Sequence, residues 1–220
     1  PTCGSGAFLF AAMNILEPLY EACVNGMRKF NEENPNLFKE NLAELDTKYR
    51  SNVQYFIYKT IILNNLYGVD IMHEAVEIAK LRLFLKMVAV VDVDMRADNL
   101  GLDPLPDIDF NIRCGNTLVG YATEEQLNND LSYGDMFANL EFKDKIETEM
   151  QKVSKTFDRF RKLQLTQSPD DMQAFKDAKR ELNERLAALN DLLNHKMYQE
   201  ITVGGQSYES WLASHQPFHW

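Results

Sequence analysis

The chain opens on a short glycine-bearing loop that runs directly into an apolar segment with helical spacing. This glycine loop, residues 1–6, reads Pro-Thr-Cys-Gly-Ser-Gly. Two glycines one residue apart let the backbone turn tightly and approach a ligand, and the N–H groups of the following helix point back at whatever binds there. A loop of this kind normally leaves the end of a β-strand, so the opening predicts an α/β fold with a nucleotide-type cofactor loop. Because no strand stands before Pro1, we expect the chain to be a fragment.

A second segment has the pattern of a buried strand that ends in an acid. Residues 65–71 read Asn-Leu-Tyr-Gly-Val-Asp-Ile, and residues 73–83 continue with helical spacing. A buried parallel strand of this kind delivers its carboxylate to the ligand edge of a sheet, where Asp70 suits the hydroxyl groups of a ribose. A local role, as an N-cap-type residue before the next helix, explains Asp70 equally well.

A third segment combines a short strand pattern with a polar turn. Residues 109–120 read Asp-Phe-Asn-Ile-Arg-Cys-Gly-Asn-Thr-Leu-Val-Gly. The amide of Asn116 offers a carbonyl oxygen that accepts hydrogen bonds. Taken alone, the pattern favours an Asn-containing turn after a strand.

Together the three segments resemble the S-adenosylmethionine-dependent adenine-specific DNA methyltransferases. The glycine loop matches their Asp-Pro-x-x-Gly-Ser-Gly motif through its proline, its serine and both glycines, with the leading Asp expected just before Pro1. The Asp70 and Asn116 segments follow in the order found in large restriction-modification (type IIG-like) methylases and in the phage-exclusion (BREX-type) methyltransferases. The resemblance covers about half of the chain, namely residues 1–30, 60–121 and 211–220.

The resemblance implies methyl transfer from S-adenosylmethionine to the exocyclic amine of adenine in double-stranded DNA. Asp70 would accept hydrogen bonds from both ribose hydroxyls, Ile71 would pack on the adenine of the cofactor, and Asn116 would accept from its amine. None of these residues would act as an acid or base, because the sulfonium already makes the methyl group electrophilic. The methionine part of the cofactor would be surrounded by Thr2, Cys3, Gly4, Ser5 and Gly6.

The catalytic signature of these enzymes does not occur in the chain. It is Asn-Pro-Pro-Tyr or a close variant, and the family would place it soon after residue 220. In the family its Asn and a backbone carbonyl position the adenine amine, and its aromatic ring stacks on the flipped-out base. We therefore expect this chain alone to be inactive, and DNA to be contacted by regions outside it.

The predicted fold is a partial Rossmann-like methyltransferase domain dominated by helices. Only two strands are expected, near residues 66–71 and 111–114, because the resemblance places the first and fourth strands of the sheet outside the chain. Without those strands, the turn at residues 4–6 is expected to be displaced or absorbed into a helix.

Apolar residues at helical spacing predict four helices before the third segment. The first spans residues 5–30, with Ser5 as its N-cap and Pro18 as a possible kink, and a polar break at residues 31–36 follows it. Three more are expected at residues 37–45, 53–63 and 74–91. The core is expected to include Tyr55, Phe56, Tyr58, Ile61 and Ile62.

Two long apolar stripes predict an antiparallel helical hairpin at residues 135–200, with Ser168 as the cap and Pro169 as the first residue of its second helix. The first stripe consists of Phe142, Ile146, Met150, Val153, Phe157 and Phe160, and the second of Met172, Phe175, Leu182, Leu186, Leu189 and Leu193. As an insertion, the hairpin would brace another domain, mediate self-association or contact DNA phosphates. Its basic residues alternate with acidic ones, so we expect them to form a solvent-exposed helix face and not a DNA-binding surface. These basic residues are Lys152, Lys155, Arg159, Arg161 and Lys162.

The expected organisation is a partial S-adenosylmethionine-binding domain at residues 1–134, the hairpin insertion at 135–200 and a tail at 201–220. The acidic stretch at residues 92–109 invites a metal site, but its spacing favours a solvated connector. In the tail, Pro217 between His215 and His219 argues against a helical metal-ligand pair, so both histidines are expected to be structural.

Composition and net charge argue against several other classes of protein. The formal charge is −10, from 33 acidic and 23 basic residues, which is the wrong sign for a stand-alone DNA-binding module. We find no signal peptide and expect no membrane-spanning run, so we expect a cytoplasmic protein without a membrane partner. The cysteines Cys3, Cys23 and Cys114 are odd in number and far apart, which favours reduced thiols over a disulfide framework or a zinc site.

Two other classes of function stay open at this point. The helical hairpin would make the chain an interaction module in which the cofactor segments are vestigial. Alternatively, a methyltransferase that acts on protein or RNA would share all three segments, because they contact only the cofactor.

Overall fold

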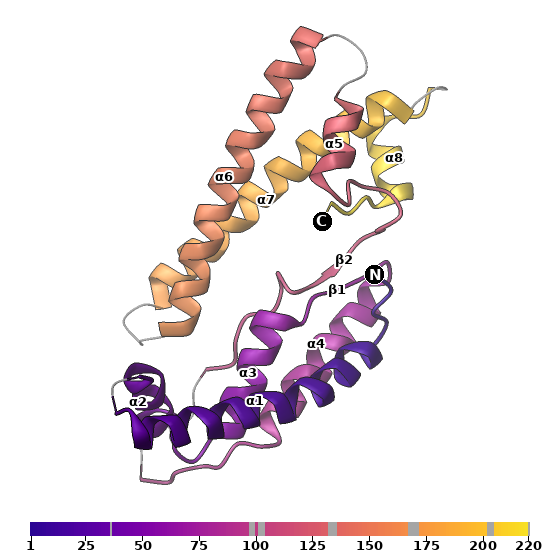
Figure 1. The fold of residues 1–220 in the computed structure, drawn as a ribbon. Helices are drawn as coiled ribbons and strands as arrows, with labels where there is room; N and C mark the ends of the chain where they lie inside the picture. Colours follow the sequence, from indigo (N-terminus) through magenta and orange to yellow (C-terminus); the bar gives the residue numbers. More distant parts are fainter. Residues whose placement is uncertain are drawn as a thin grey trace. The chain divides into compact units, whose positions relative to one another are not determined.

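The computed structural model describes residues 1–35, 37–96, 100, 104–131, 136–166, 172–201 and 205–219. Its contacts group the chain into two compact units, Pro1–Cys114 and Gly115–Trp220, which are described separately (Figure 1). The boundaries expected at residues 134 and 200 divide the chain by function and stay a prediction.

The first unit places helices around a two-stranded parallel sheet. Its elements are α1 (Ala7–Glu33), α2 (Lys39–Thr47), α3 (Val53–Asn65), β1 (Gly68–Asp70), α4 (His73–Val88) and β2 (Ile112–Cys114). In the register of the sheet, Gly68 lies opposite Ile112 and Asp70 lies opposite Cys114. The expected strand-poor, helix-dominated structure is confirmed for the described residues, and both strands form within the segments where they were expected.

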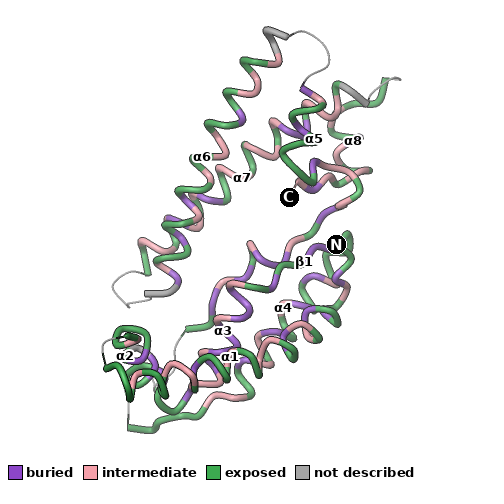
Figure 2. The backbone as a smooth tube through the Cα atoms, viewed as in Figure 1, coloured by how far each residue is buried: buried purple, intermediate pink, exposed green. Residues whose placement is uncertain are grey.

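Apolar residues of α1, α3, α4 and β2 form the core of the first unit, and Figure 2 colours its buried positions purple. Met13, Leu83 and Ile112 are fully buried in it. The prediction for α3 is confirmed, since Tyr55, Tyr58, Ile61 and Ile62 are buried and Phe56 packs against the same cluster. Burial of this apolar surface is the main favourable contribution to folding of the unit.

The start of α1 differs from the sequence prediction. The helix begins at Ala7, and Gly6 occupies the N-cap position with a φ of 90° and no side-chain cap, so the prediction of Ser5 as N-cap is wrong. Both Ser5 oxygens instead accept hydrogen bonds from Arg82 of α4. The helix runs through Pro18 and ends at Glu33, which lies inside the predicted polar break.

By length and composition α1 is apolar enough to cross a membrane, so the expectation that the chain has no such segment is wrong. In the first unit Leu9, Met13 and Val24 of this helix are buried, whereas Phe8, Ile15 and Leu19 are exposed. Core helices of water-soluble proteins meet the same criterion, and this property alone therefore assigns no membrane.

The second unit is built on the predicted helical hairpin. It contains α5 (Glu124–Asp130), α6 (Met136–Thr166), α7 (Met172–Ile201) and α8 (Tyr208–His215). Helices α6 and α7 run antiparallel and pack along each other (Figure 1). Ile146, Phe160 and Leu182 of the two stripes are buried, and the rings of Phe160 and Phe175 stack at 5.2 Å. The predicted cap at Ser168 and Pro169 lies outside the described residues.

The tail after α8 pairs with the segment that follows β2. The Asn116 N–H donates to the Gln216 carbonyl at 2.7 Å, and the Phe218 N–H donates to the Val119 carbonyl at 2.8 Å. Gly120 lies against this tail with a φ of +147°. These contacts join residues about 100 positions apart in the sequence.

His219 is held as a neutral imidazole in this tail, in keeping with the structural role expected for it. Its Nδ1 accepts from the Tyr121 N–H at 3.1 Å, and its Nε2 lies 2.9 Å from Asn194 Oδ1, which requires a proton on Nε2. Burial lowers the pKa of His219 to about 4. The neutral form is therefore favoured in the folded state.

We predict that this histidine makes the second unit less stable at acidic pH. Its contribution is complete above the ordinary pKa of 6.5 and is lost as pH falls from there toward about 4, at a cost of up to about 2 kcal/mol for a partly exposed ring. Thermal unfolding across this range should show a steeper loss for the native protein than for His219→Gln, which does not titrate. Parallel pH profiles would contradict the prediction.

Candidate cofactor site

The glycine loop lies directly against β1. The Cys3 N–H donates to the Val69 carbonyl at 3.0 Å, and the Gly4 N–H donates to Asp70 Oδ2 at 2.8 Å. Residues 4–6 form a turn outside α1. The expectation that this turn is displaced or absorbed into a helix is therefore wrong, because contacts with Asp70 and Arg82 hold it in place without further strands.

Backbone conformation explains the two glycines of the loop. Gly4 and Gly6 have φ values of +54° and +90°, which L residues with side chains rarely adopt. A Cβ on Gly4 would meet nothing within 4 Å, whereas a Cβ on Gly6 would lie 3.2 Å from the Cβ of Ala79. Gly6 is thus required both by its conformation and by the close approach of α4.

The turn leaves several backbone donors open at the start of α1. The first helical hydrogen bond runs from the Phe10 N–H to the Gly6 carbonyl. Within the described part of the chain, no acceptor is found for the N–H groups of Ser5, Ala7, Phe8 and Leu9. Such a set of N–H groups at a helix start attracts an anionic or carboxylate group.

Asp70 connects the loop, β1 and the start of α4. Its Oδ2 accepts from Gly4, and its Oδ1 accepts from the Met72 N–H at 3.0 Å. The N-cap of α4 is Met72 and has no side-chain cap, so the interpretation of Asp70 as an N-cap residue is wrong; its bond to Met72 is a local turn contact just before the helix. Each carboxylate oxygen can accept a second hydrogen bond, so this geometry is compatible with ribose binding as well. The residue keeps only 8% of its accessible surface.

Apolar and thiol side chains complete the surroundings of Asp70. Ile71 directly follows it and is 51% exposed, which leaves its side chain accessible to a ligand. Burial, with a contribution from the Asp70 carboxylate, raises the pKa of the Cys3 thiol. The thiol is therefore protonated at neutral pH and is a weak nucleophile.

Asn116 belongs to the second unit, whereas the glycine loop, Asp70 and Ile71 belong to the first. Its Oδ1 accepts from the Leu118 N–H at 3.0 Å, which is the Asn-containing turn considered above. Its proposed contact with the adenine of the cofactor stays a prediction.

Arg82 is a contact of the loop that sequence reasoning missed. It lies on α4, and its guanidinium Nη1 donates to the Ser5 carbonyl at 2.7 Å and to Ser5 Oγ at 3.3 Å. The available signal was a cation between two leucines in the helix that follows the Asp70 strand. Its partner lies 77 residues away in sequence, so helical periodicity alone gave no reason to single it out.

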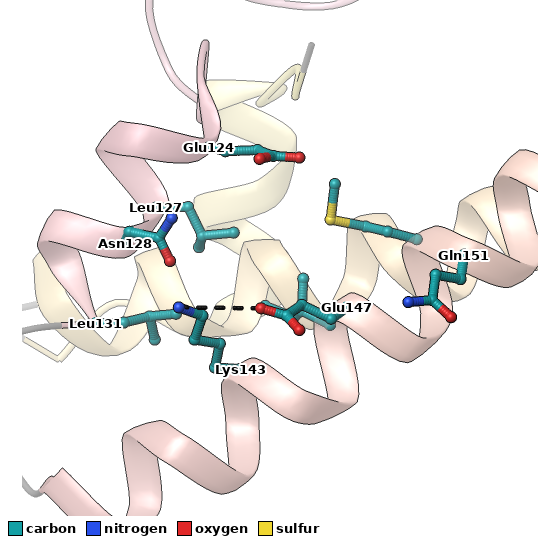
Figure 3. A pocket seen from close by; sticks show the side chains of 9 residues that line it. Glu124, Leu127, Asn128, Leu131, Lys143, Glu147 and Gln151 are labelled. Atoms are coloured by element: carbon teal, nitrogen blue, oxygen red, sulfur yellow. Dashed lines mark ion pairs between the residues drawn. The ribbon is translucent and has the colours of Figure 1, made fainter.

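A separate cavity of about 260 Å³ lies between α5 and α6 of the second unit (Figure 3). Its apolar lining is Leu127, Leu131, Ile146 and Met150, and its polar lining is Glu124, Asn128, Lys143, Glu147 and Gln151. Lys143 and Glu147 face each other at 3.9 Å. Two carboxylates against one ammonium give this cavity the wrong charge for a phosphate or a DNA backbone.

No group of three or more His, Cys, Asp or Glu side chains that could hold a metal ion occurs among the described residues. In the acidic stretch at residues 92–109, Asp98 and Asp103 lie outside that description. Lys80 joins the end of this stretch to α4, because its ammonium contacts both Asp109 and Glu77 at 2.9 Å.

Comparison with known proteins identifies the family to which the chain belongs. The Eco57I restriction-modification methylase family matches residues 64–207. A relative from Methanocaldococcus jannaschii, described as a candidate type II restriction enzyme and methyltransferase, is 39% identical over 133 residues, which are 60% of this chain and 9% of the relative. No solved structure matches the chain. Since the family match spans more than half of the chain, this protein belongs to the Eco57I restriction-modification methylases.

Proposed function

We propose that the protein is an S-adenosylmethionine-dependent methyltransferase that modifies the exocyclic amine of adenine in DNA, in a restriction-modification or phage-defence enzyme. The observation that carries the proposal is the glycine loop bound to the carboxylate of Asp70 at the end of a parallel strand. Family membership supplies the methylase chemistry, and adenine as the target rests on the sequence resemblance.

The residues of the first unit fit this cofactor. The open N–H groups at the start of α1 suit the methionine carboxylate, and the spare acceptor positions on Asp70 suit ribose hydroxyls. Exposed Ile71 offers an apolar surface for the adenine ring. When bound, the sulfonium group supplies the activated methyl, and the residues of this chain bind and orient the donor without moving a proton.

DNA contacts are proposed to lie mainly outside this chain. Its net charge is −10, and the residues aligned with the relative from M. jannaschii make up 9% of that protein. A surface that binds DNA phosphates requires clustered Lys and Arg. We place the whole protein in the cytoplasm, where DNA substrate and reduced cysteines are both expected.

The packing of the hairpin argues against the alternative that the chain is an interaction module. Ile146, Phe160 and Leu182 of its stripes are buried within the second unit. A second copy cannot use these side chains while α6 and α7 stay paired. The hairpin is therefore proposed as a rigid insertion of the methylase.

Cofactor binding tests the proposal directly. Asp70→Ala should weaken S-adenosylmethionine binding by the full-length protein about a hundredfold, because it removes the ribose acceptor and the Gly4 anchor. Glu74→Ala is the matched control, since Glu74 is an exposed acid in the first turn of α4. Calorimetry should give unchanged affinity for that control, and equal affinities for all three proteins would exclude this site.

The substrate class is tested by following labelled methyl groups. The full-length protein should transfer them to unmethylated DNA and leave N6-methyladenine after digestion. Label on cytosine would contradict the adenine assignment, and label only on RNA or protein would favour the rival methyltransferase class.

A further inference from the structure

Arg82 is an exposed residue of α4 whose guanidinium is held by two different groups near the glycine loop. It donates to the carbonyl and hydroxyl oxygens of Ser5, and its Cζ lies 4.6 Å from the centre of the Phe10 ring. A planar guanidinium can donate along its edge while its face stacks on an aromatic ring, which a lysine ammonium cannot do. The side chain therefore ties the loop to the first turn of α1.

The bond to Ser5 lies directly before the start of α1. In a regular helix start, the Ser5 carbonyl would accept from the Leu9 N–H four residues later. Here the Ser5 carbonyl accepts from Arg82, and Leu9 donates to no acceptor among the described residues. Gly6, with its φ of +90°, then ends the loop and the helix starts at Ala7.

The bond from Arg82 affects the backbone N–H groups that the start of α1 offers to a ligand. If the bond from Arg82 were lost, the Ser5 carbonyl could turn to accept from the Leu9 N–H, so that Ser5 would become the N-cap and Gly6 the first residue of the helix. That change would remove one donor and move the turn that contacts Asp70. Arg82 thus favours the conformation in which the helix-start donors stay open.

We infer that Arg82 is a positioning residue for the methionine end of S-adenosylmethionine, acting by holding the Ser5 carbonyl outside α1. This inference rests on the proposed cofactor function. In this role Arg82 makes no contact with the cofactor. Its role differs from that of Asp70, which is proposed to bind the ribose.

Two ligands distinguish this role from a general loss of structure. S-adenosylmethionine carries the methionine part, whereas 5′-deoxy-5′-methylthioadenosine keeps the adenine and ribose but lacks the amino acid. Arg82→Gln in the full-length protein should weaken binding of S-adenosylmethionine about tenfold and binding of 5′-deoxy-5′-methylthioadenosine less than about twofold, because the conformation with open donors becomes less populated. Arg82→Lys should recover part of this loss, because it restores a charged donor to Ser5.

Lys86→Gln is the matched control. Lys86 lies on the same helix, and its ammonium is 5.1 Å from the centre of the Tyr58 ring. We expect the native affinity for both ligands from this variant. Unchanged S-adenosylmethionine binding by Arg82→Gln, or an equal loss for both ligands, would overturn the inference.

Amide hydrogen exchange tests the same inference without a ligand. The Leu9 amide should exchange faster in the native protein than in Arg82→Gln, where it bonds to the Ser5 carbonyl. Equal exchange in both proteins would contradict the inference. Failure of the native protein to bind S-adenosylmethionine, by contrast, would overturn the proposed function while leaving this exchange result to decide the role of Arg82.

Discussion

Replacing Gly120 by alanine should detach the tail from the second unit and lower its free energy of unfolding by about 3–5 kcal/mol. Gly120 has a φ of +147°, and an added Cβ would lie 2.0 Å from the carbonyl oxygen of Phe218 and 2.6 Å from its carbonyl carbon. These are backbone atoms, so no side-chain rotation relieves the overlap. Relief requires the tail to move, which breaks the bond from the Phe218 N–H to Val119.

Gly205→Ala separates backbone strain from overlap. Gly205 also has a positive φ, of +80°, but a Cβ there would meet nothing within 4 Å. We expect a loss of only about 1 kcal/mol for this control. Denaturant unfolding measures both variants, and an NMR titration should show the pKa of His219 rising toward its ordinary value in Gly120→Ala. Similar unfolding free energies for the two variants would refute the overlap argument.

Replacing Asn111 by aspartate should destabilise the first unit by about 3–5 kcal/mol at neutral pH. The buried Asn111 amide Nδ2 lies 3.2 Å from the Ile62 carbonyl, 3.2 Å from that of Leu63 and 3.1 Å from that of Leu66. Aspartate has nearly the same shape but offers an anionic oxygen in place of the donor. The carboxylate would face three acceptors in a buried site, so its desolvation is uncompensated.

The stability of Asn111→Asp should increase as the pH falls. Burial and the facing carbonyls should raise the pKa of the new carboxyl above its unfolded value, so stability returns as pH falls and the group becomes a protonated donor. Asn65→Asp is the control, because Asn65 Oδ1 accepts from the Tyr20 hydroxyl at 2.7 Å and a carboxylate keeps that bond. Guanidinium unfolding at neutral pH and near pH 4 compares them. Equal stability of the two variants at neutral pH would show that the amide of Asn111 is dispensable.

Helix positions were largely predictable from local sequence. Residues 53–63 were expected to be helical and α3 spans Val53–Asn65, and the stripes at residues 135–200 correspond to α6 and α7. These helices follow from the repeat of apolar side chains every three or four residues, which is a property of neighbouring positions. The strand that ends at Asp70 was recognised from its short apolar run and its terminal acid.

Sequence reasoning was wrong where partners distant in sequence compete for the same group. Ser5 has the residue type of an N-cap, but Arg82 takes both of its oxygens and Gly6 becomes the cap. The turn at residues 4–6 was expected to shift, yet Asp70 holds it against β1. A pattern within one segment does not reveal a hydrogen bond to a side chain more than sixty residues away.

The amino-acid sequence by itself determined the helical stripes, the short parallel strands and the glycine loop, because each depends on residue spacing or on backbone freedom within a few positions. Only the tertiary structure decided how Asp70 and Arg82 hold that loop, how Asn111, just before β2, bonds to the end of α3, and how the tail pairs beside Gly120. Each of these contacts brings together groups far apart along the chain, and forming one depends on the packing of the helices and strands that carry its two partners.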